Sequence, residues 1–334
     1  MPEVLSKFRL QDIVKGYSGS KRAVYERAAV NVTHRKFDRR WAKVKMFVKP
    51  DKHPFSEIKD KAPRAIQYRS PEFNLLLAQY LKPFEEALYK LKTDSGLRYF
   101  AKGRNLQQRA ADILEAYDCY ENCVVIEADH SKFDSCVNVD HLKFCHKLYN
   151  KFFHSKTLWF LLSKQLNNKG ISNYWKYKVK GTRMSGDFDT ALGNSMLNWF
   201  VLQAAIRRCG ISDFHVYIDG DDSLIFMSKF DSEKFKTVNF SDFGFETTWA
   251  IKDLITAEFC KAHLIRCDPP TLVRDPRRIV AHLQVCLKTY GPETWPELLQ
   301  GKYVCEYWAN QGVPYVMKWL SLQLDKKLPA KVPP

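Results

Sequence analysis

Residues 215–226 read HVYIDGDDSLIF, two apolar runs joined by the short acidic sequence Asp-Gly-Asp-Asp. Apolar runs of this length and composition predict buried strands, and Asp-Gly supplies positive-φ residues for the tight turn of a hairpin. The turn accounts for Asp219 and Gly220 but not for Asp221 and Asp222, whose mutual repulsion costs stability unless a cation lies between them. An acidic surface turn is the simplest interpretation of so short a motif. A cation site requires that other segments of the chain supply partners for Asp221 and Asp222.

The remaining sequence predicts an alternation of helices and strands. Continuous or alternating apolar runs indicate strands at 123–129 (CVVIEAD) and around FETTWA, and helical spacing indicates helices over 75–91, 138–162, 185–210 and 231–240. Pro83 should kink or divide the first of these helices. The N-terminal third is typical of loops and short strands, and Pro-rich turns followed by helices are expected after Cys260. This order predicts an α+β sandwich rather than a doubly wound sheet.

Positive charge is concentrated in the first third of the chain. The 334 residues carry a net charge of +16, and residues 1–110 contain 25 Lys and Arg against 11 Asp and Glu. Such a distribution predicts a surface for a polyanion, either nucleic acid or nucleotide phosphates. An anionic membrane would instead favour an amphipathic basic helix, which the sequence does not indicate. No apolar run approaches the ~18 residues that a membrane span requires.

The nine cysteines indicate free thiols in a reducing compartment. Cys119 with Cys123, or Cys260 and Cys267 with His263, are alternatives for a zinc site. Since no pair with Cys-x-x-Cys spacing accompanies either group, buried structural cysteines are the preferred interpretation.

The strand at 123–129 ends in a carboxylate, Asp129, and Asp134 follows five residues later. If this strand lies beside the hairpin, Asp129 joins Asp221 and Asp222 in a set of oxygen ligands that suits Mg²⁺. Two such ions about 3.5–4 Å apart can hold the attacking and leaving oxygens of a phosphoryl transfer. Taken alone, Asp129 is equally well explained as the N-cap of the following helix.

Three segments together resemble motifs A, B and C of viral RNA-dependent RNA polymerases, in the same order and spacing. They are Asp129-x4-Asp134, the run Ser185-Gly186-Asp187 with Thr190 and Asn194, and Gly220-Asp221-Asp222. Upstream, KMFVKPDKHPFSEIKDKAPRAIQYRSPEFN resembles the basic motif F, while FGFETTWAIK and AEFCKAHLI stand where motifs D and E belong. The combination is most similar to tombusvirus-like replicases of positive-strand RNA viruses, and it extends over residues 14–265.

The resemblance implies catalytic and sugar-binding roles. Asp129 and Asp221 would bridge two Mg²⁺ ions, or Mn²⁺ in their place, and Asp222 would be a further ligand. Asp134 and Asn194 would sense the ribose 2′-OH, because a carboxylate and an amide can hold a hydroxyl that DNA precursors lack.

Further nucleotide-binding residues follow from the same resemblance. Ser185 and Gly186 would belong to a loop that contacts the template and the incoming nucleotide. Thr190 would either orient Asp134 or occupy an ordinary helix face. Four cations of motif F would line the path by which nucleotides reach the site: Lys49, Lys61, Arg64 and Arg69.

Two positions depart from the family pattern. Asp219 stands where many members have Asn, and it adds a negative charge beside the metal-binding pair. The lysine expected in motif D as general acid is replaced by Thr247 and Thr248, which leaves Lys252 as a weak candidate.

The resemblance also implies a right-hand polymerase of fingers, palm and thumb, with an antiparallel palm sheet flanked by helices. Residues 1–121 would form the fingers and fingertips, with a fingers insertion at 150–182. The palm would comprise 122–149, which contains motif A, and 183–262, which contains motifs B to E. The thumb would be 263–334.

The implied activity is the synthesis of RNA from NTPs on an RNA template, as in the replication of a positive-strand virus genome. It would take place in the host cytoplasm at membrane-associated sites, with another viral replication protein providing attachment. One alternative is a reverse transcriptase, but a bulky aromatic residue usually occupies the position of Asp134 there. The other is a replication factor that binds RNA and has lost catalysis, although all three metal carboxylates are present.

Overall fold

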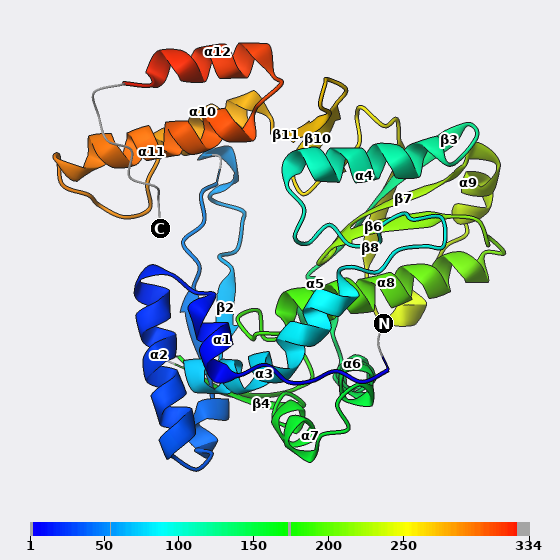
Figure 1. Cartoon of the computed structure of the whole chain (residues 1–334). Helices are drawn as coiled ribbons and strands as arrows, with labels where there is room; N and C mark the ends of the chain where they lie inside the picture. The colour runs from blue at the N-terminus through cyan, green and yellow to red at the C-terminus, as the bar shows by residue number, and fades with distance from the viewer. Residues whose placement is uncertain (1–2, 54, 173–174, 326–334) are drawn as a thin grey trace.

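A computed structural model of the chain describes residues 3–53, 55–172 and 175–325 (Figure 1). Its central sheet has four antiparallel strands in the order β6-β7-β3-β8. These strands are β3 (Cys123–His130), β6 (His215–Asp219), β7 (Asp222–Ser228) and β8 (Thr247–Lys252). The predicted hairpin, the predicted strand at 123–129 and the α+β class are therefore confirmed.

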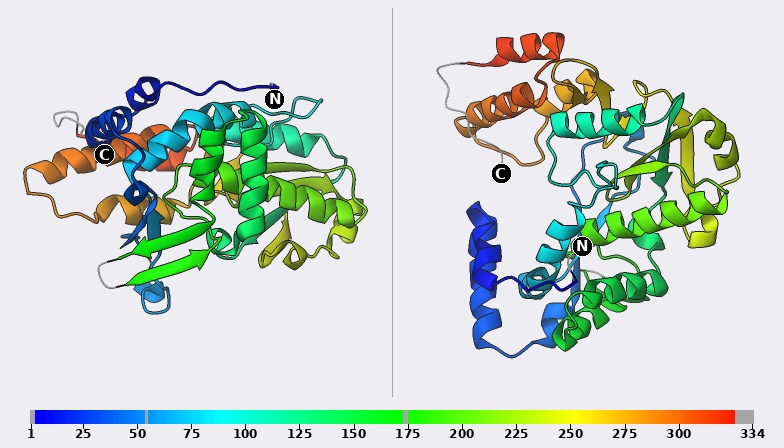
Figure 2. Two further views of the ribbon diagram at one scale, coloured as in Figure 1. Left: turned by 90° about the horizontal axis from the view of Figure 1, so that it is seen from below. Right: turned by 45° about the vertical axis from the view of Figure 1, so that its right-hand side comes forward.

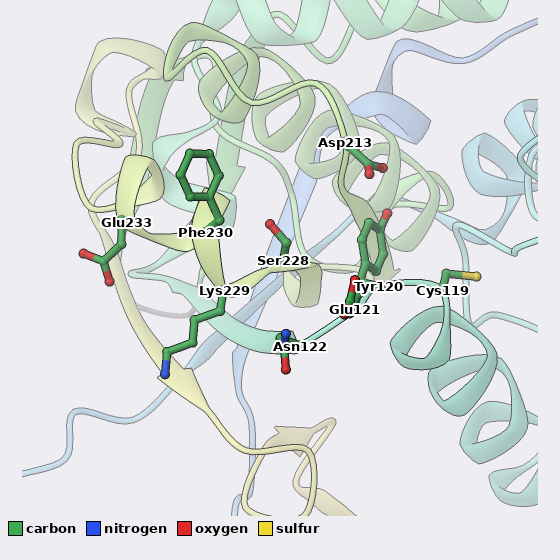
Figure 3. A pocket seen from close by; sticks show the side chains of 9 residues that line it. All are labelled: Cys119, Tyr120, Glu121, Asn122, Asp213, Ser228, Lys229, Phe230 and Glu233. Carbon is green, nitrogen blue, oxygen red and sulfur yellow. The ribbon is translucent and has the colours of Figure 1, made fainter.

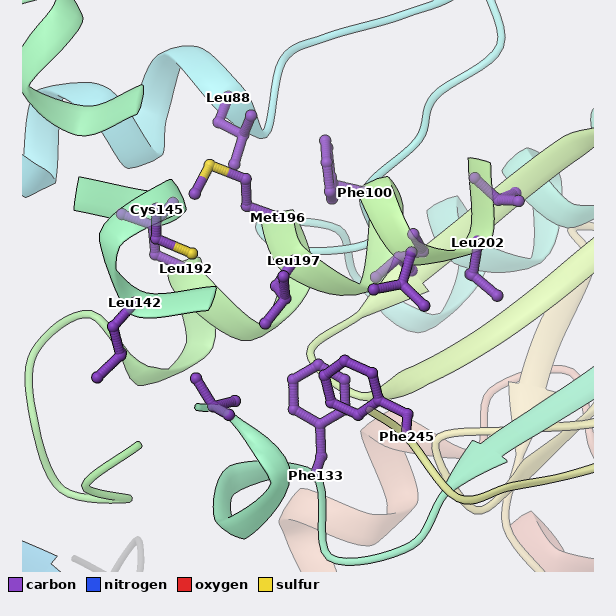
Figure 4. Packing of buried hydrophobic residues seen from close by; sticks show 14 of the residues in the cluster. Leu88, Phe100, Phe133, Leu142, Cys145, Leu192, Met196, Leu197, Leu202 and Phe245 are labelled. Carbon is purple, nitrogen blue, oxygen red and sulfur yellow. The ribbon is translucent and has the colours of Figure 1, made fainter. Parts of the chain in front are cut away.

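Helices cover both faces of this sheet because side chains alternate between its faces along each strand. On one face, Val125 of β3 shares a core with Ile113 of α4 (Leu106–Asp118). On the other face, Ile126 belongs to the core that also contains α8 (Thr190–Arg208). In Figure 4, Met196 of α8 points toward Leu88, and Leu197 points toward Phe133 and Phe245.

Helices other than α8 also contribute to the larger core. They are α3 (Pro71–Leu88), α5 (Phe133–Cys136), α6 (Val139–Lys151), α7 (Lys156–Ser163) and α9 (Lys229–Phe235). The α3 helix is buried along most of its length, with Phe73 and Leu77 fully enclosed. The core thus continues from the sheet through α8 and into the N-terminal half of the chain.

The N-terminal region combines two helices with a second sheet. Helices α1 (Leu10–Lys15) and α2 (Gly19–His34) pack on α3. The sheet has the order β2-β1-β4-β5 and consists of β1 (Val44–Val48), β2 (Ala65–Tyr68), β4 (Asn167–Ile171) and β5 (Lys176–Lys180). Its β1–β4 pair is parallel and its other pairs are antiparallel. Short 3₁₀ helices at Arg39–Ala42 and Phe55–Glu57 flank β1.

The C-terminal region begins with a small antiparallel sheet of order β11-β10-β9. Its strands are β9 (Glu258–Phe259), β10 (Ala262–Ile265) and β11 (Thr271–Val273), and three helices follow: α10 (Pro276–Gln284), α11 (Thr294–Ala309) and α12 (Pro314–Gln323). The strands were not expected from the sequence, which predicted only turns before the helices. They are too short for a periodic pattern to identify them.

The segment between β1 and β2 connects the two ends of the chain. Figure 1 shows it reaching from the N-terminal helices to α10, and the same arrangement appears in Figure 2. Lys52 Nζ donates hydrogen bonds to the main-chain oxygens of His282, at 2.8 Å, and Val285, at 2.5 Å. These carbonyls lie at the C-terminal end of α10, where unpaired acceptors and the helix dipole favour a cation.

Several predicted boundaries were wrong. A 16-residue helix, α2, occupies part of the N-terminal third that was expected to form loops and short strands. Pro83 does not divide α3. The carbonyl that Pro83 leaves free in the helix, that of Gln79, instead accepts the main-chain N–H of Phe8 at 2.7 Å. Tertiary structure therefore supplies the hydrogen bond that the proline removes.

Other helices are shorter than expected. The predicted helix at 138–162 is two helices, separated around His154, which has a positive φ of 47°. The helix expected from residue 185 begins at Thr190, and the one expected at 231–240 is Lys229–Phe235. Within the described ranges, no helix is both long and apolar enough to cross a membrane.

Candidate active site

The hairpin between β6 and β7 has a two-residue turn. Asp219 pairs with Asp222 across the hairpin, so the turn consists of Gly220 and Asp221. Gly220 has a φ of 72°, a conformation that glycine adopts without strain. The expectation that Asp219 is a turn residue is wrong, because it is the last residue of β6.

Strand register brings Asp129 to the same place. Ala128 of β3 pairs with Ser223 of β7, so the next step along the antiparallel pair sets Asp129 opposite Asp222. Residues directly opposite each other on neighbouring strands have Cβ atoms about 4.5–5.5 Å apart. Asp129, Asp221 and Asp222 are all exposed. The sheet thus gathers three carboxylates at one edge.

The crowding of these carboxylates affects protonation. Partial desolvation by the surrounding protein, together with the negative charges of Asp221, Asp219 and Asp129, raises the pKa of Asp222 to about 6. Lys261 opposes this shift. A carboxyl whose charged form is disfavoured in this way is stabilised as a carboxylate by a bound cation.

Asp219 has a different environment although it lies in the same hairpin. Its carboxylate forms ion pairs with Lys102, at 2.6 Å, and Arg109 of α4, at 2.9 Å. The side chain of Asp219 is only 9% exposed. The extra negative charge noted in the sequence is therefore offset by two cations and serves to attach the hairpin to α4.

Two residues of α8 that sequence reasoning missed hold the turn in place. The Ser195 hydroxyl accepts the main-chain N–H of Gly220 at 2.9 Å. Asn198 Nδ2 donates to the main-chain oxygens of Gly220, at 3.1 Å, and Asp221, at 3.2 Å. Both side chains are fully buried, so they replace water as partners of the turn backbone. Helical spacing from Asn194 was an available signal for Asn198, which lies four residues later on the same side of the helix. Ser195 follows Asn194 directly, and helical spacing gives no such signal for it.

His130, next to Asp129, completes this support. Its Nε2 lies 3.0 Å from Asn198 Oδ1, and its Nδ1 lies 2.7 Å from the Thr247 hydroxyl. Because Asn198 uses its Nδ2 as a donor to the turn, His130 must carry its proton on Nε2 and accept from Thr247 on Nδ1. Burial lowers the pKa of His130, which agrees with this neutral form.

The two predicted sugar-sensing residues are in direct contact. Asn194 Nδ2 donates a 2.7 Å hydrogen bond to Asp134 Oδ1. Burial raises the pKa of Asp134, and the Asn194 hydrogen bond opposes that rise. The Thr190 hydroxyl donates to the main-chain oxygens of Met184 and Asp187, both at 2.9 Å. The Thr190 hydroxyl thus bonds to the main chain at the start of α8 instead of orienting Asp134, and Asn194 is the residue that contacts Asp134.

The predicted loop residues lie against β2. Gly186 N donates to Gln67 O at 2.7 Å, and Gln67 N donates to the Ser185 hydroxyl at 3.2 Å. A Cβ at position 186 would lie 2.6 Å from Tyr68 Cβ, so only glycine permits this close approach. The turn before α8 is therefore coupled to the N-terminal sheet.

The predicted motif F cations separate into two groups. Arg64 forms a 2.7 Å ion pair with Asp51, and Lys49 forms one of 3.3 Å with the same carboxylate. The Asp51 partner raises the pKa of Arg64, and the more distant Asp221 contributes in the same direction. Lys61 is exposed. Arg64 is thus both exposed and close enough to the carboxylates to interact with them.

Arg69 was wrongly predicted to line the path of the nucleotides. Its side chain is completely buried and forms an ion pair with Asp187 and a hydrogen bond with Asn168. It also donates to the main-chain oxygens of Ala42 and Lys164, both at 3.1 Å. A buried guanidinium with every direction occupied is a structural connection between β2 and the turn before α8.

Lys252 does not lie near the carboxylates. It pairs with Val125, four residues along β3 from Asp129, which is roughly 13 Å at the rise of a strand. The expectation that Lys252 could act as general acid is therefore wrong. Lys261, in the turn between β9 and β10, is closer, since Asp222 and Asp129 both contribute to raising its pKa after the larger effect of Glu258.

The carboxylate oxygens of this site suit a hard cation that is also bound by water or substrate phosphates. Within the described part of the chain, no three His, Cys, Asp or Glu side chains form a complete metal cluster. The exposed carboxylates Asp129, Asp221 and Asp222 still match Mg²⁺, which is bound in many enzymes by one or two carboxylates plus water and substrate phosphates. In addition to this match of ligand type, the raised pKa of Asp222 fits a cation bound between the carboxylates. Neither group of cysteines considered for zinc forms such a cluster, and Cys119 is exposed rather than buried.

A cavity of about 600 Å³ lies at the opposite end of the central sheet (Figure 3). Its lining includes Asn122, just before β3, and Ser228, the last residue of β7. The six residue steps from Cys123 to Asp129 span roughly 20 Å, so this cavity is separate from the carboxylates.

Comparison with known proteins identifies the family. The family described as viral RNA dependent RNA polymerase matches residues 4–332. The chain is 30% identical over 328 residues to an RNA-directed RNA polymerase of Groundnut rosette virus (strain MC1), a match that covers 93% of this chain and 38% of the relative. It is 33% identical over 327 residues to that of Carnation mottle virus, with 94% and 42% covered, and 32% identical over 273 residues to that of Turnip crinkle virus, with 78% and 35% covered.

The chain spans about two fifths of the length of these curated relatives. The family match nevertheless includes every element that forms the carboxylate site, from β3 to β8. On this match, and with the geometry of the three carboxylates, the chain belongs to the viral RNA-dependent RNA polymerase family.

Proposed function

We propose that this chain synthesises RNA on an RNA template by nucleotidyl transfer, in the replication of a positive-strand RNA virus genome. The observation that carries the proposal is the strand register that sets Asp129 opposite Asp222 and beside the turn residue Asp221. The 3′-OH of the growing strand attacks the α-phosphate of an NTP, and pyrophosphate leaves. Asp129 and Asp221 would hold two Mg²⁺ ions, or Mn²⁺ in their place, with Asp222 as a further ligand. When bound, these ions stabilise the charge that develops on the attacking and leaving oxygens.

The protein's own contribution is a rigid support for the carboxylates. Ser195 and Asn198 hold the turn backbone, while Lys102 and Arg109 offset the charge of Asp219. The turn residue Asp221 is thereby positioned before substrate arrives, which reduces the reorganisation needed during the reaction.

Nucleotide phosphates are attracted by the cations near the site. We assign this role to Arg64, Lys49 and Lys61, with Ser185 and Gly186 contributing the loop that faces template and nucleotide. Asp51 pairs with both Arg64 and Lys49 and so holds the two cations together, and Arg64 is close enough to Asp221 for their charges to interact. Charge-assisted hydrogen bonds from guanidinium and ammonium groups are the usual means of holding phosphates.

Asp134 and Asn194 would select ribonucleotides. A site that hydrogen-bonds a hydroxyl discriminates by ~10⁴ or more against an analogue that lacks it, because buried polar groups are left unpaired. Asn194→Ala should lower kcat/KM for ATP and leave kcat/KM for dATP unchanged or higher. Asp134→Ala should act in the same direction with a larger loss of activity. Unchanged ratios in both variants would remove these residues from the sugar site.

We further propose a right-hand arrangement for the observed elements. Residues 1–121 and 150–182 would be fingers, 122–149 and 183–262 palm, and 263–334 thumb. The central antiparallel sheet with α8 on one face lies within the palm ranges and supports the palm assignment. Helix α4 packs on the other face of this sheet, although the proposed bounds place it in the fingers. Partners would be template and product RNA, NTPs and another viral replication protein, at membrane-associated sites in the host cytoplasm.

The decisive experiment is nucleotide incorporation by the purified chain on a defined RNA template, with and without primer and Mg²⁺. RNA synthesis that requires the template, Mg²⁺ and Asp221 supports the proposal. Preference for dNTPs would favour a reverse transcriptase, and RNA binding without incorporation would favour a factor that has lost catalysis. The matched control is Asp242→Asn, since Asp242 is an exposed carboxylate outside the site.

A further inference from the structure

A buried row of polar side chains leads away from the sugar-sensing pair. Asn194 Nδ2 donates to Asp134, and Asn194 Oδ1 accepts a 3.2 Å hydrogen bond from Arg183 Nε. Arg183 Nη1 forms a 2.6 Å ion pair with Asp189. The Arg183 and Asp189 side chains are 1% and 0% exposed. Arg183 therefore binds the oxygen of the Asn194 amide, whereas Asp134 binds its nitrogen.

The chemistry of these groups allows one orientation of the Asn194 amide. Guanidinium only donates hydrogen bonds, so the group that Asn194 turns toward Arg183 must be its oxygen. Its NH₂ group must then face Asp134, whose carboxylate only accepts. The positions of Arg183 and Asp134 thus determine which end of the amide faces the sugar-sensing carboxylate, independently of how an amide is assigned in a structure.

Helix α8 is built to admit the guanidinium. A Cβ at Gly193 would lie 2.5 Å from Arg183 Cζ, so any larger residue would displace the guanidinium group. Gly193 is in the first turns of α8, where glycine is less favourable than alanine by about 1 kcal/mol. This cost of a helical glycine is explained by the space that Arg183 requires next to Asn194.

We infer that Arg183 is a positioning residue for ribose recognition: it holds the Asn194 amide with its NH₂ group on Asp134, and Gly193 provides the space for it. This inference rests on the proposed function, since it concerns the site that would bind the 2′-OH of the NTP. With the amide locked, Asp134 keeps its second oxygen and remaining lone pairs for the hydroxyl. Without Arg183, the amide can rotate and present its oxygen to Asp134, so that the pair no longer has a single arrangement.

The test compares ATP and dATP on one RNA template. Arg183→Lys keeps a charge for Asp189 but lacks the fork that reaches both Asp189 and Asn194. Gly193→Ala removes no polar side chain but displaces the Arg183 guanidinium. Both variants should lose about tenfold in the ratio of kcat/KM for ATP to kcat/KM for dATP, through slower use of ATP, which corresponds to one hydrogen bond.

The matched control is Arg104→Lys. Arg104 forms a similar two-pronged pair with a largely buried carboxylate, Asp112, at 2.9 and 2.8 Å, on α4 rather than at the sugar site. This change should lower stability and leave the ratio unaltered. If Arg183→Lys and Gly193→Ala also leave the ratio unaltered while Asn194→Ala lowers it, the inference is overturned.

A readout that does not depend on activity separates this inference from the proposed function. In protein labelled with ¹⁵N-asparagine, the Asn194 side-chain amide should exchange its hydrogens slowly in wild type and faster in Gly193→Ala. Equal exchange in both proteins overturns the role of Arg183. A wild-type chain that incorporates no nucleotide overturns the proposed function instead. If Arg183→Lys fails to fold, Gly193→Ala decides both measurements, because that chain still contains the guanidinium that balances the buried charge of Asp189.

Discussion

Asp219 and Asp221 are the same type of residue and only one residue lies between them, but the groups that surround their carboxylates differ. Lys102 and Arg109 neutralise Asp219, which is nearly buried, whereas Asp221 is exposed in the turn beside Asp222. A carboxylate with two cationic partners contributes to the architecture, and one that faces other carboxylates is available to a metal ion. The difference arises because Asp219 lies on the side of the hairpin that faces α4, where Arg109 can pair with it.

The first prediction concerns Asp221→Asn. The change should leave the fold and RNA binding intact but remove a charged metal ligand, and nucleotide incorporation should fall by a factor of 10² or more, as is usual for losing transition-state charge stabilisation. The measurement is the rate of single-nucleotide incorporation at saturating NTP and Mg²⁺. Incorporation at the wild-type rate would show that Asp221 is not a ligand.

A second prediction follows from the pKa of Asp222, which is raised from 3.8 to about 6. In the absence of metal, the folded protein binds this proton more tightly than the unfolded chain. The contribution of Asp222 to the free energy of unfolding should therefore decline as the pH rises from about 4 to 6 and stay low above that range. Mg²⁺ should reverse the effect, because it favours the carboxylate.

The measurement is Tm from pH 4 to 8, with and without Mg²⁺, for wild type and Asp222→Asn. The variant should show a flatter pH profile and a smaller rise of Tm with Mg²⁺ at pH 7.5. A wild-type Tm that rises with pH over the same window in the absence of metal, with no change of slope in Asp222→Asn, would contradict the assignment.

At the scale of elements, α8 connects the two functions of the site. Asn194 of this helix contacts Asp134, and Ser195 and Asn198 contact the hairpin turn. Because all three positions belong to one rigid helix, the sugar-sensing pair and the metal-binding turn keep a constant separation. The turn before this helix is also hydrogen-bonded to β2, through Gly186.

Asn198→Ala is the prediction at this scale. It leaves the main-chain oxygens of the turn without their donor and His130 without its acceptor, and unpaired buried groups cost about 1–3 kcal/mol each. We expect the free energy of unfolding to fall by about 2–3 kcal/mol, with a loss of incorporation activity even under conditions in which the variant is folded. Chemical denaturation and incorporation rates measure the two effects.

Asn239→Ala is the control for Asn198→Ala. Asn239 is an exposed asparagine whose hydrogen bonds are to its near neighbours Ser241 and Asp242. Its removal should change stability by no more than about 0.5 kcal/mol, as is usual at the surface. If Asn198→Ala were equally mild, the turn would not depend on α8.

At the scale of the whole molecule, the segment between β1 and β2 links the N-terminal region to the C-terminal helices (Figure 1). Lys52 makes this link by donating to two carbonyls at the end of α10, and Lys302 of α11 donates to the same two carbonyls at 3.2 Å. Two ammonium groups thus share one set of acceptors. The contact joins the segment between β1 and β2 to the C-terminal helices.

Lys52→Ala should weaken this contact. If RNA is held between the N-terminal region and the C-terminal helices, it should then dissociate about threefold to tenfold faster, in proportion to the loss of a charge-assisted hydrogen bond of about 1 kcal/mol. Dissociation of a labelled RNA template, measured with an excess of unlabelled competitor, tests the expectation. Lys59→Ala is the control, since Lys59 is exposed in the same segment and carries the same charge. Equal dissociation rates in the two variants would exclude a role for the contact.

The sequence alone determined those features that depend on local pattern. Alternation and β-branching identified β3 and the hairpin, and Asp-Gly identified the tight turn, because strand and turn preferences act over a few residues. The same runs indicated Asp129, Asp221 and Asp222 as one set, and the structure brings them to one edge of the sheet. Boundaries such as the start of α8 were less well predicted, since local propensity does not determine where a helix ends.

Only the tertiary structure decided which polar residues are structural. Arg69 and Asp187 are 118 positions apart in the sequence, and nothing in the basic pattern around Arg69 distinguishes it from the exposed Arg64. The same is true of Arg183, whose partners and whose space at Gly193 exist only once α8 has packed. A charged residue is functional or structural according to the groups that surround it after folding, because burial and pairing, rather than residue type, determine where its charge can act.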